Sequence, residues 1–197
     1  FGFMLFDPSS TFESIETNVG FLRRIVDDGS VAAVFCKMLP YDGTPIKETL
    51  MAQGRFNGDV CNPDYDFLDP RIARCYEAIG RTVGEWVRGS DCVAAMINHA
   101  WHEVFVMERL FEPAADLVAY KTALSAVTKF SNNILFSVVE EICDGFREGG
   151  GECQQYSGLG QIREQILATL VQQRNRFVYE NQSWLLKGIS KQTLVTA

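Results

Sequence analysis

The sequence MLPYDGTPIKETL at residues 38–50 joins an apolar run to a segment with helical spacing. Pro40 has no backbone N–H to donate to a neighbouring strand, and Gly43 permits a tight turn. Thr44 is a suitable N-cap residue, and Pro45 then stands at the first helical position, where a missing N–H leaves no bond unmade. This stretch therefore predicts the end of a strand, a turn and the start of a helix.

Two apolar runs, residues 1–6 and residues 31–39, precede this turn. Runs without alternation are typical of strands that are buried on both faces, as in parallel sheets. The segment between them, residues 12–26, has apolar residues at helical spacing, and we expect Ser10 and Glu13 to form a capping box at its start. A strand, a helix and a second strand in this order predict a βαβ unit with parallel strands and a right-handed crossover.

The remainder of the chain divides into an irregular part and a helical part. Residues 55–69, rich in Asn, Asp and Gly, are expected to form a linker. Apolar residues at helical spacing then predict helices over approximately residues 70–87, 91–111, 114–146 and 161–179. Helices of this length with short connections usually pack as an antiparallel bundle. We therefore expect a βαβα portion over residues 1–54 and a helical domain over residues 70–197.

Composition limits the classes of partner. The chain has 197 residues, of which 47% are hydrophobic and 22% are charged, as is typical of a globular protein that buries a core. Its formal net charge of -7 argues against binding to nucleic acid, which requires a concentrated Lys/Arg face. No apolar run reaches the roughly 18 residues needed to span a bilayer, and the first residues do not form a signal peptide. We therefore expect a cytoplasmic protein with no nucleic-acid partner and no membrane partner.

The six cysteines, at positions 36, 61, 75, 92, 143 and 153, are too widely spaced to form a Cys-x-x-Cys pair. A metal site built from cysteine alone is therefore not expected. Because no secretory signal is visible and several of these cysteines lie on apolar helix faces, we expect reduced thiols in the core rather than disulfides.

The predicted sheet is too small to be stable alone. Parallel strands with apolar residues on both faces need neighbouring strands and covering helices, and only two such strands are predicted. Either the sheet pairs with other copies of the chain, or the chain is the C-terminal portion of a longer polypeptide that supplies the earlier strands.

Two segments of the first 70 residues carry a family resemblance. One is GFMLFDP at residues 2–8 followed by TFES at residues 11–14, and the other is LPYDGTPI at residues 39–46. In this order and spacing they resemble the fifth strand and helix, and the loop after the sixth strand, of radical S-adenosylmethionine enzymes, of the class that also carries a cobalamin-binding domain.

The resemblance implies a fold, cofactors and binding residues. The fold would be α/β plus all-α, with the last βαβ unit of a partial (β/α) barrel followed by a C-terminal helical bundle. This family binds S-adenosylmethionine at an iron–sulfur cluster and cleaves it to a 5′-deoxyadenosyl radical, and cobalamin would be a further cofactor of the complete enzyme. By position, the groups that flank the adenine match Met4 and Phe6 on the first strand and Lys37, Met38 and Leu39 on the second.

The chain has no Cys-x-x-x-Cys-x-x-Cys loop, which holds the cluster in this family. We therefore expect the chain alone to bind none of these cofactors and to be inert without a cluster-bearing N-terminal half of the same polypeptide. The alternative function is an autonomous helical interaction module that acts by dimerisation, without catalysis.

Three side chains near the strand ends are candidates for substrate or cofactor contact. Asp7 could hydrogen-bond to substrate or to a ribose hydroxyl, or could form an Asx turn with Pro8. Lys37 lies in an otherwise apolar strand, and a buried ammonium needs a carboxylate or a ligand unless it reaches the end of the sheet. Tyr41 could line the mouth of the barrel or pack under the following helix.

The two histidines, His99 and His102, stand three residues apart on one predicted helix, a spacing that lets two imidazoles share a metal. Such a site needs carboxylates from neighbouring helices, for which Glu140 and Glu141 are the only obvious pair. We therefore favour ordinary polar-face roles for both histidines and predict no metal site. The sequence also has no Gly-x-Ser-x-Gly elbow and no glycine-rich loop followed by Lys, so neither a serine nucleophile nor a phosphate loop is predicted.

Overall fold

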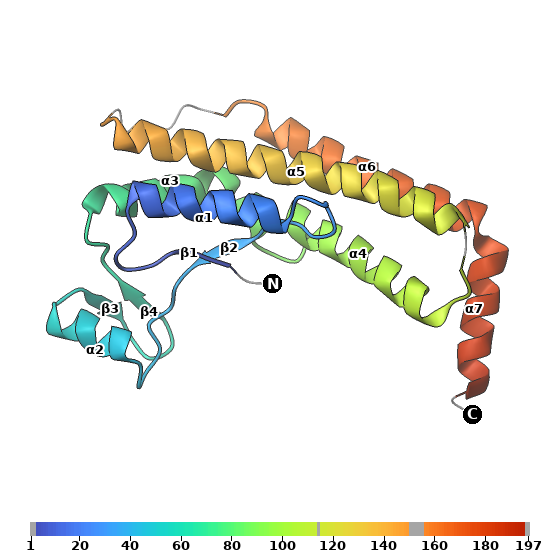
Figure 1. Cartoon of the computed structure of the whole chain (residues 1–197), viewed down its shortest axis with the longest axis horizontal. Helices are drawn as coiled ribbons and strands as arrows, with labels where there is room; N and C mark the ends of the chain where they lie inside the picture. Colours follow the sequence, from blue (N-terminus) through green and yellow to red (C-terminus); the bar gives the residue numbers. More distant parts are fainter. Residues whose placement is uncertain (1–2, 114, 150–155, 196–197) are drawn as a thin grey trace. The chain divides into compact units, whose positions relative to one another are not determined.

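The computed structural model describes residues 3–113, 115–149 and 156–195 of the chain (Figure 1). Short N-terminal strands with their helices are followed by a mostly helical part of several packed helices, so the predicted fold class is confirmed at this level. The chain forms two compact units. The first comprises Phe1–Arg24, Val34–Gly84 and Phe136–Gln155, and the second comprises Ile25–Ala33, Glu85–Leu135 and Tyr156–Ala197.

The predicted βαβ unit opens the chain. Its elements are β1 (Phe3–Phe6), α1 (Phe12–Ile25) and β2 (Phe35–Lys37). The two strands pair in parallel, with Phe3 opposite Phe35 and Met4 opposite Cys36. The register shifts between Met4 and Phe6, which places Phe6 opposite Lys37. The parallel pairing inferred from the order of the elements is therefore confirmed.

The second strand is shorter than the sequence predicts, because residues 31–34 are not part of it. Their backbone is satisfied by side chains instead of by a neighbouring strand. Ala32 donates its N–H to Asn98 Oδ1 at 3.1 Å, and Ala33 donates its N–H to Asn132 Oδ1 at 2.8 Å. Two buried N–H groups thus have partners without a β-ladder, so the apolar run continues as extended chain rather than as strand.

The turn after β2 follows the prediction in outline. Gly43 has a φ of 76°, and α2 (Pro45–Ala52) begins with Pro45 after an extended Thr44. The Thr44 hydroxyl does not cap the helix, because it donates back to the Tyr41 carbonyl at 2.6 Å. Here the backbone conformation and the proline, rather than a side-chain cap, start the helix.

The capping box of α1 lies one residue further along than predicted. Thr11 Oγ1 accepts the N–H of Ser14 at 3.2 Å, and Ser14 Oγ accepts the N–H of Thr11 at 2.9 Å. Ser10, predicted as the cap, accepts the N–H of Asp7 at 2.8 Å and so closes the turn before the helix. The prediction of Ser10 and Glu13 is wrong because α1 begins at Phe12, which makes Thr11 the N-cap residue and Ser14 the N3 residue.

The stretch expected to be irregular contains a β-hairpin. Strands β3 (Phe56–Gly58) and β4 (Pro63–Tyr65) pair antiparallel, with Phe56 opposite Tyr65. Asp59 Oδ1 accepts the N–H groups of Cys61 and Asn62 at 2.7 and 2.8 Å and closes the turn. Strands of three residues are too short to show a period of two, and so the sequence gives no alternation to recognise.

Aromatic rings form the core beneath β1. Phe6 is fully buried, and its ring lies 5.2 Å from Tyr76, 6.3 Å from Phe67 and 6.4 Å from Phe35, centroid to centroid. Tyr65 packs edge-on against Phe67 at 5.3 Å. The hairpin, β1 and helix α3 (Pro70–Val87) therefore share one core in the first unit.

Helices make up most of the described chain from residue 70 onward. The four helices predicted from residue 70 onward are confirmed as α3, α4 (Val93–Leu110), α5 (Ala115–Arg147) and α6 (Leu159–Glu180), and a further helix, α7 (Gln182–Val195), follows them. Trp86 donates to Ser131 Oγ at 3.0 Å, and Trp101 donates to Thr128 Oγ1 at 3.1 Å. Within the part of the chain that the structure describes, no helix is both long enough and apolar enough to cross a bilayer.

Candidate functional site

The carboxyl ends of β1 and β2 lie at the same edge of the sheet, because the two strands are parallel. Asp7 follows β1, and residues 38–41 follow β2. Met38 donates its N–H to the Phe6 carbonyl at 2.8 Å, so the two segments remain hydrogen-bonded one residue beyond β2. In open α/β sheets ligands bind outside the carboxyl ends of the strands, which makes this edge the candidate site.

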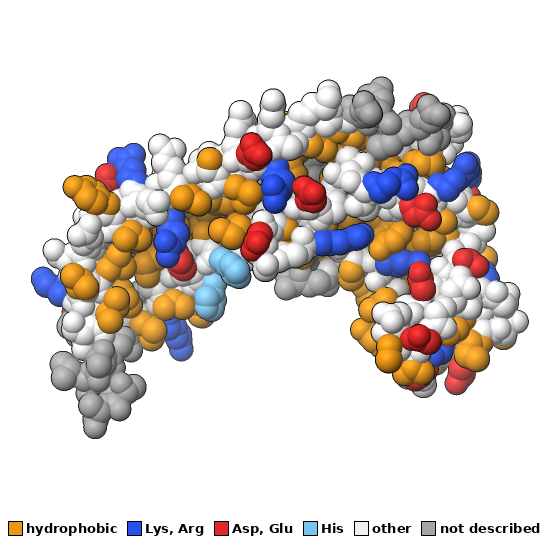
Figure 2. Space-filling model, turned by 180° about the vertical axis from the view of Figure 1, so that it is seen from behind, with side chains coloured by type: hydrophobic (Ala, Val, Ile, Leu, Met, Phe, Trp, Pro, Cys, Tyr) orange, Lys and Arg blue, Asp and Glu red, His pale blue; other side chains and the backbone are white. Residues whose placement is uncertain are grey.

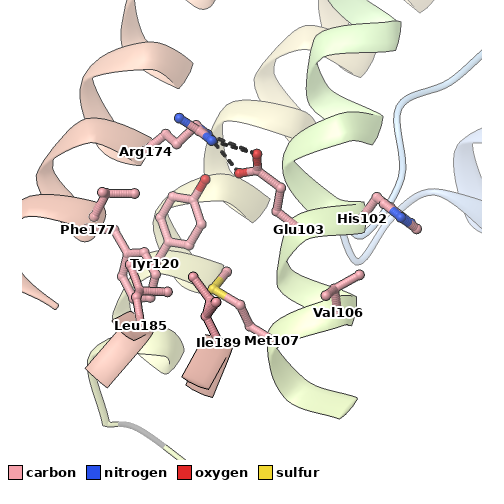
Figure 3. Close-up of a pocket in the computed structure, with 10 residues that line it drawn as sticks. His102, Glu103, Val106, Met107, Tyr120, Arg174, Phe177, Leu185 and Ile189 are labelled. Carbon is pink, nitrogen blue, oxygen red and sulfur yellow. Dashed lines mark hydrogen bonds and ion pairs between the residues drawn. The ribbon is translucent and has the colours of Figure 1, made fainter. Parts of the chain in front are cut away.

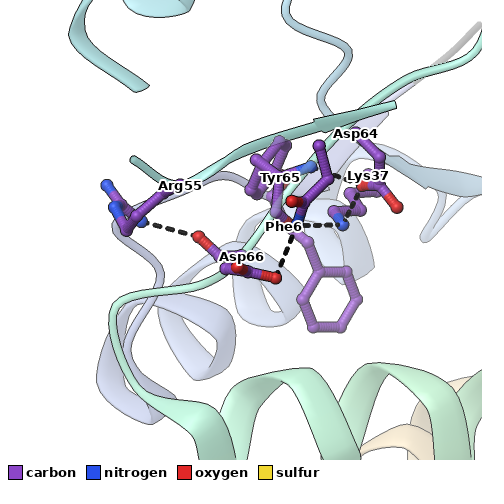
Figure 4. A network of polar contacts seen from close by, with 7 residues as sticks. Phe6, Lys37, Arg55, Asp64, Tyr65 and Asp66 are labelled. Atoms are coloured by element: carbon purple, nitrogen blue, oxygen red, sulfur yellow. Dashed lines mark hydrogen bonds and ion pairs between the residues drawn. The ribbon is translucent and has the colours of Figure 1, made fainter. Parts of the chain in front are cut away.

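The charge of Lys37 is compensated within the chain at this edge. Its Nζ forms an ion pair with Asp64 and donates to the Tyr65 carbonyl at 3.0 Å (Figure 4). The ammonium also lies over three rings, 4.1 Å from Tyr65, 4.8 Å from Phe67 and 5.5 Å from Tyr76. The carboxylate that a lysine in an apolar strand requires is therefore supplied by the hairpin of the same chain.

Arg55 links the hairpin to the turn after β1 by hydrogen bonds. Its Nη1 donates to the Pro8 carbonyl at 2.9 Å and to the Asp66 carbonyl at 2.7 Å, and Asp66 donates its N–H back to Arg55 at 2.9 Å (Figure 4). Tyr65 adds a long bond from its hydroxyl to the Phe6 carbonyl at 3.4 Å. Burial of this phenol raises the pKa of Tyr65 well above its usual value, so it stays protonated and donating.

Asp7 and Tyr41, the two residues predicted to contact a substrate, differ in their surroundings. Asp7 Oδ1 accepts the N–H of Ser9 at 2.7 Å, which is the Asx turn considered for it beside Pro8. Tyr41 extends from the loop with 63% of its surface exposed. The first side chain has a local partner that shapes the turn, whereas the second is accessible to a ligand.

One strip of the sheet is left uncovered. Met4 is 59% exposed, and Cys36, its partner across the parallel pair, is also exposed. This differs from the sequence prediction of strands buried on both faces. An apolar strip on a parallel pair is unusual, because parallel sheets are covered on both sides. The strip can offer an apolar surface to a planar ring or to another chain.

Only some of the five residues that were predicted to contact the cofactor lie in or beside this strip. Met4 is exposed in it, Met38 is half-buried at its end, and Leu39 is 44% exposed in the loop beyond. Phe6 is enclosed by the aromatic core, and the Lys37 ammonium is bound to Asp64. Sequence reasoning missed Cys36 and Asp64. The apolar run that contains Cys36 shows no alternation that would mark it as exposed, and nothing short of the hairpin pairing brings Asp64 to Lys37.

The histidines lie in the second unit. His99 and His102 are both exposed on α4, and Figure 2 shows the pale-blue imidazoles at the surface. Glu140, one of the carboxylates considered for them, pairs with Arg23 at 2.6 Å in the first unit. Among the described residues, no group of three or more His, Cys, Asp or Glu side chains is placed to hold a metal ion.

The cysteines within the described ranges differ in their exposure. Cys36 and Cys61 are exposed, whereas Cys75, Cys92 and Cys143 are buried. Cys75 Sγ lies 3.5 Å from Cys143 Sγ, a contact between thiols inside the first unit. The sixth cysteine, at position 153, lies outside the described residues.

Comparison with known protein families, with curated proteins and with solved structures finds no significant match to this chain.

Proposed function

We propose that this chain is the C-terminal portion of a radical S-adenosylmethionine enzyme of the cobalamin-binding class. In this proposal β1, α1, β2 and α2 are the last βαβ unit and helix of a partial (β/α) barrel, and the helices beyond them form a substrate-side or docking extension. Two features support it: the motifs at residues 2–14 and 39–46, and the parallel strand order in which they lie.

The uncovered strip of Met4 and Cys36 carries the proposal. A two-stranded parallel sheet is not stable with an open apolar face, so the strip needs an occupant. In a barrel of this family the adenine of S-adenosylmethionine and the neighbouring strands would cover it. Met4, Met38 and Leu39 would then contact the cofactor directly, and Phe6 and Lys37 would act behind them by fixing the position of the strands.

The iron–sulfur cluster does not fit the residues described. A cluster needs cysteine ligands close together, and no such group occurs in the described part of the chain. We therefore assign the cluster to an N-terminal half of the same polypeptide, and the chain alone would be inert. With that half present, the cofactor would supply a 5′-deoxyadenosyl radical, while Asp7 and Tyr41 stand at the sheet edge where a substrate would lie.

The test begins with the gene upstream of the codon for Phe1. We expect an open reading frame that encodes a Cys-x-x-x-Cys-x-x-Cys loop, and we expect the joined polypeptide, reconstituted anaerobically, to release 5′-deoxyadenosine. A reading frame without the three cysteines would reject the proposal. A joined polypeptide that holds its cluster but forms no 5′-deoxyadenosine would reject it as well.

A second copy of the chain is the alternative occupant of the strip. The same exposed pair, Met4 and Cys36, favours this reading, because self-association would also cover an apolar sheet face. Light scattering coupled to size exclusion would then give twice the mass of the chain, and Met4→Asp would return it to a monomer. A monomer at all concentrations would exclude this alternative.

A further inference from the structure

A cavity of about 290 Å³ lies among the helices of the second unit. Its wall is mostly apolar, with Met107 from α4, Phe177 from α6, and Leu185 and Ile189 from α7 (Figure 3). The volume is near the lower end of small-molecule sites, which span about 300–1,000 Å³ and are lined mainly by apolar side chains with a few polar groups.

Tyr120 brings an unsatisfied hydroxyl to this cavity. The side chain is 5% exposed, and its hydroxyl has no hydrogen-bond partner among the described residues. Its ring is fixed by stacking on Phe177, with 4.8 Å between centroids and 14° between planes. Figure 3 shows the hydroxyl directed toward Arg174 and Glu103. A buried hydroxyl without a partner is unfavourable, so a ligand that bonds to it would gain affinity.

The charges beside this hydroxyl already neutralise each other. Arg174 donates to Glu103 through Nε and Nη2, with contacts of 2.8 to 3.0 Å. Both the guanidinium and the carboxylate are therefore engaged, and neither is left to pair with a charged ligand. Burial, with the Glu103 charge adding to it, raises the pKa of Tyr120, so the phenol is neutral and can donate.

From this geometry we propose that the cavity binds an uncharged, mainly apolar small molecule with one hydrogen-bonding oxygen, which pairs with the Tyr120 hydroxyl. Apolar side chains hold the body of the molecule, and Phe177 stacks beside the tyrosine that orients it. A charged ligand is disfavoured, because an ion without a counter-charge is costly to bury. This site lies entirely in the second unit and does not depend on the function proposed for the sheet edge.

Three rigid probes of similar shape test the proposal by equilibrium dialysis against the 197-residue chain: 2-naphthol, naphthalene and 2-naphthoate. We expect one saturable site for 2-naphthol. Naphthalene, which lacks the oxygen, should bind about fivefold more weakly, as follows from one neutral hydrogen bond. The carboxylate of 2-naphthoate should weaken binding by about tenfold or more. No saturable binding of 2-naphthol to the folded chain, or equal binding of 2-naphthoate, would overturn the proposal.

Tyr120→Phe isolates the hydroxyl while keeping the stacked ring. We expect this variant to bind 2-naphthol about fivefold more weakly than the wild type and naphthalene equally well. Its melting temperature should not fall, because the hydroxyl has no hydrogen bond to lose within the described part of the chain. Unchanged 2-naphthol affinity in Tyr120→Phe would contradict the proposal.

Ile189→Trp tests the location of the site. Ile189 lines the cavity yet is 56% exposed, so a larger side chain can enter the cavity with little strain on the helix. We expect it to abolish binding of all three probes. Leu186→Trp is the matched control, because Leu186 is 65% exposed on the same helix and does not line the cavity. Wild-type binding by Ile189→Trp, with helical circular dichroism retained, would place the probe elsewhere and overturn the assignment.

Discussion

Two largely buried polar side chains, one in each unit, differ in how they are satisfied. In the first unit, Lys37 has a carboxylate, a carbonyl and three aromatic rings around its ammonium. In the second unit, Tyr120 is buried, and its hydroxyl has no hydrogen-bond partner among the described residues. A polar group with all its partners inside the chain stabilises the fold, whereas one without partners is available to a ligand. For these two side chains, the contrast indicates that Lys37 holds the sheet in place and that Tyr120 can bind a ligand.

The largest effect is expected where the first unit is most closely packed. Phe6→Ala removes a fully buried ring from the aromatic core and should lower the free energy of unfolding by about 3–5 kcal/mol. Met4→Ala, two residues away, should cost less than about 0.5 kcal/mol, because Met4 is 59% exposed. Urea unfolding followed by circular dichroism measures both. Similar losses in the two variants would mean that the strip is covered in solution.

Two glycines with similar backbone conformations separate packing from strain. Gly29 in the second unit has a φ of 71°, and a Cβ there would lie 2.6 Å from the Ser125 carbonyl oxygen. Gly43 in the first unit has a φ of 76° and open space around it. We expect Gly29→Ala to destabilise by about 2–4 kcal/mol and Gly43→Ala by about 1 kcal/mol. Thermal unfolding checks the order, and a larger loss for Gly43→Ala would contradict it.

Removing either partner of the Lys37–Asp64 ion pair should change the stability by different amounts. Asp64→Ala leaves a nearly buried ammonium with only a carbonyl and the rings, and should destabilise the first unit by about 1–2 kcal/mol, since Asp64 itself is half-exposed. Lys37→Met places a thioether among the same rings and should be near neutral. Chemical denaturation of both variants and of the double variant gives the coupling free energy between Lys37 and Asp64. Equal losses in the two single variants would show that the pair is a surface interaction.

Two tyrosines offer a matched test of the contrast between the units. Tyr65→Phe removes a long bond to the Phe6 carbonyl and should lower the free energy of unfolding by about 0.5–1 kcal/mol. Tyr120→Phe removes a hydroxyl that has no hydrogen-bond partner among the described residues, and it should leave stability unchanged or slightly raised. Thermal unfolding of the two variants and of the wild type, measured under the same conditions, tests this difference in stability. A clear loss in Tyr120→Phe would show that its hydroxyl is satisfied in solution.

The smallest expected effect is on the stability of the fold at acid pH. The pKa of Asp28 is lowered by hydrogen bonds from the Ser30 N–H and hydroxyl, at 2.9 and 2.8 Å. A carboxyl with a lower pKa in the folded state binds protons more weakly there than in the unfolded chain, so stability rises with pH between the two values. This contribution is present above about pH 4, the unfolded value, and is lost as the pH falls through the folded pKa. Asp28→Asn should flatten that part of the stability profile, and an unchanged slope would contradict it.

The local signals in the sequence explain which elements could be predicted. Pro40, Gly43 and Pro45 act on their own backbone, and so the turn and α2 were predictable from residue type. The start of β2 was not, because Asn98 and Asn132 bond to residues 32 and 33 from far along the chain. Long-range partners of this kind leave no periodic trace.

The same limit applies to the sites. Lys37 was identifiable as a charge in an apolar strand, but its partner Asp64 follows only from the pairing of two strands of three residues. The cavity around Tyr120 is lined by side chains from four helices, and none of them is unusual within its own helix. Such sites become visible only when the helices are packed.

The measurement that tests the central claim is the rate of 5′-deoxyadenosine formation by the chain joined to the cluster-bearing half that we propose, as a function of S-adenosylmethionine concentration. If the strip contacts the cofactor, Met4→Asp should raise the KM for S-adenosylmethionine by about tenfold or more, because a buried charge would face the adenine. Val60→Asp, at a 74% exposed position in the hairpin loop, should leave it unchanged. An equal KM in wild type and Met4→Asp would contradict the proposed place of this sheet in the enzyme.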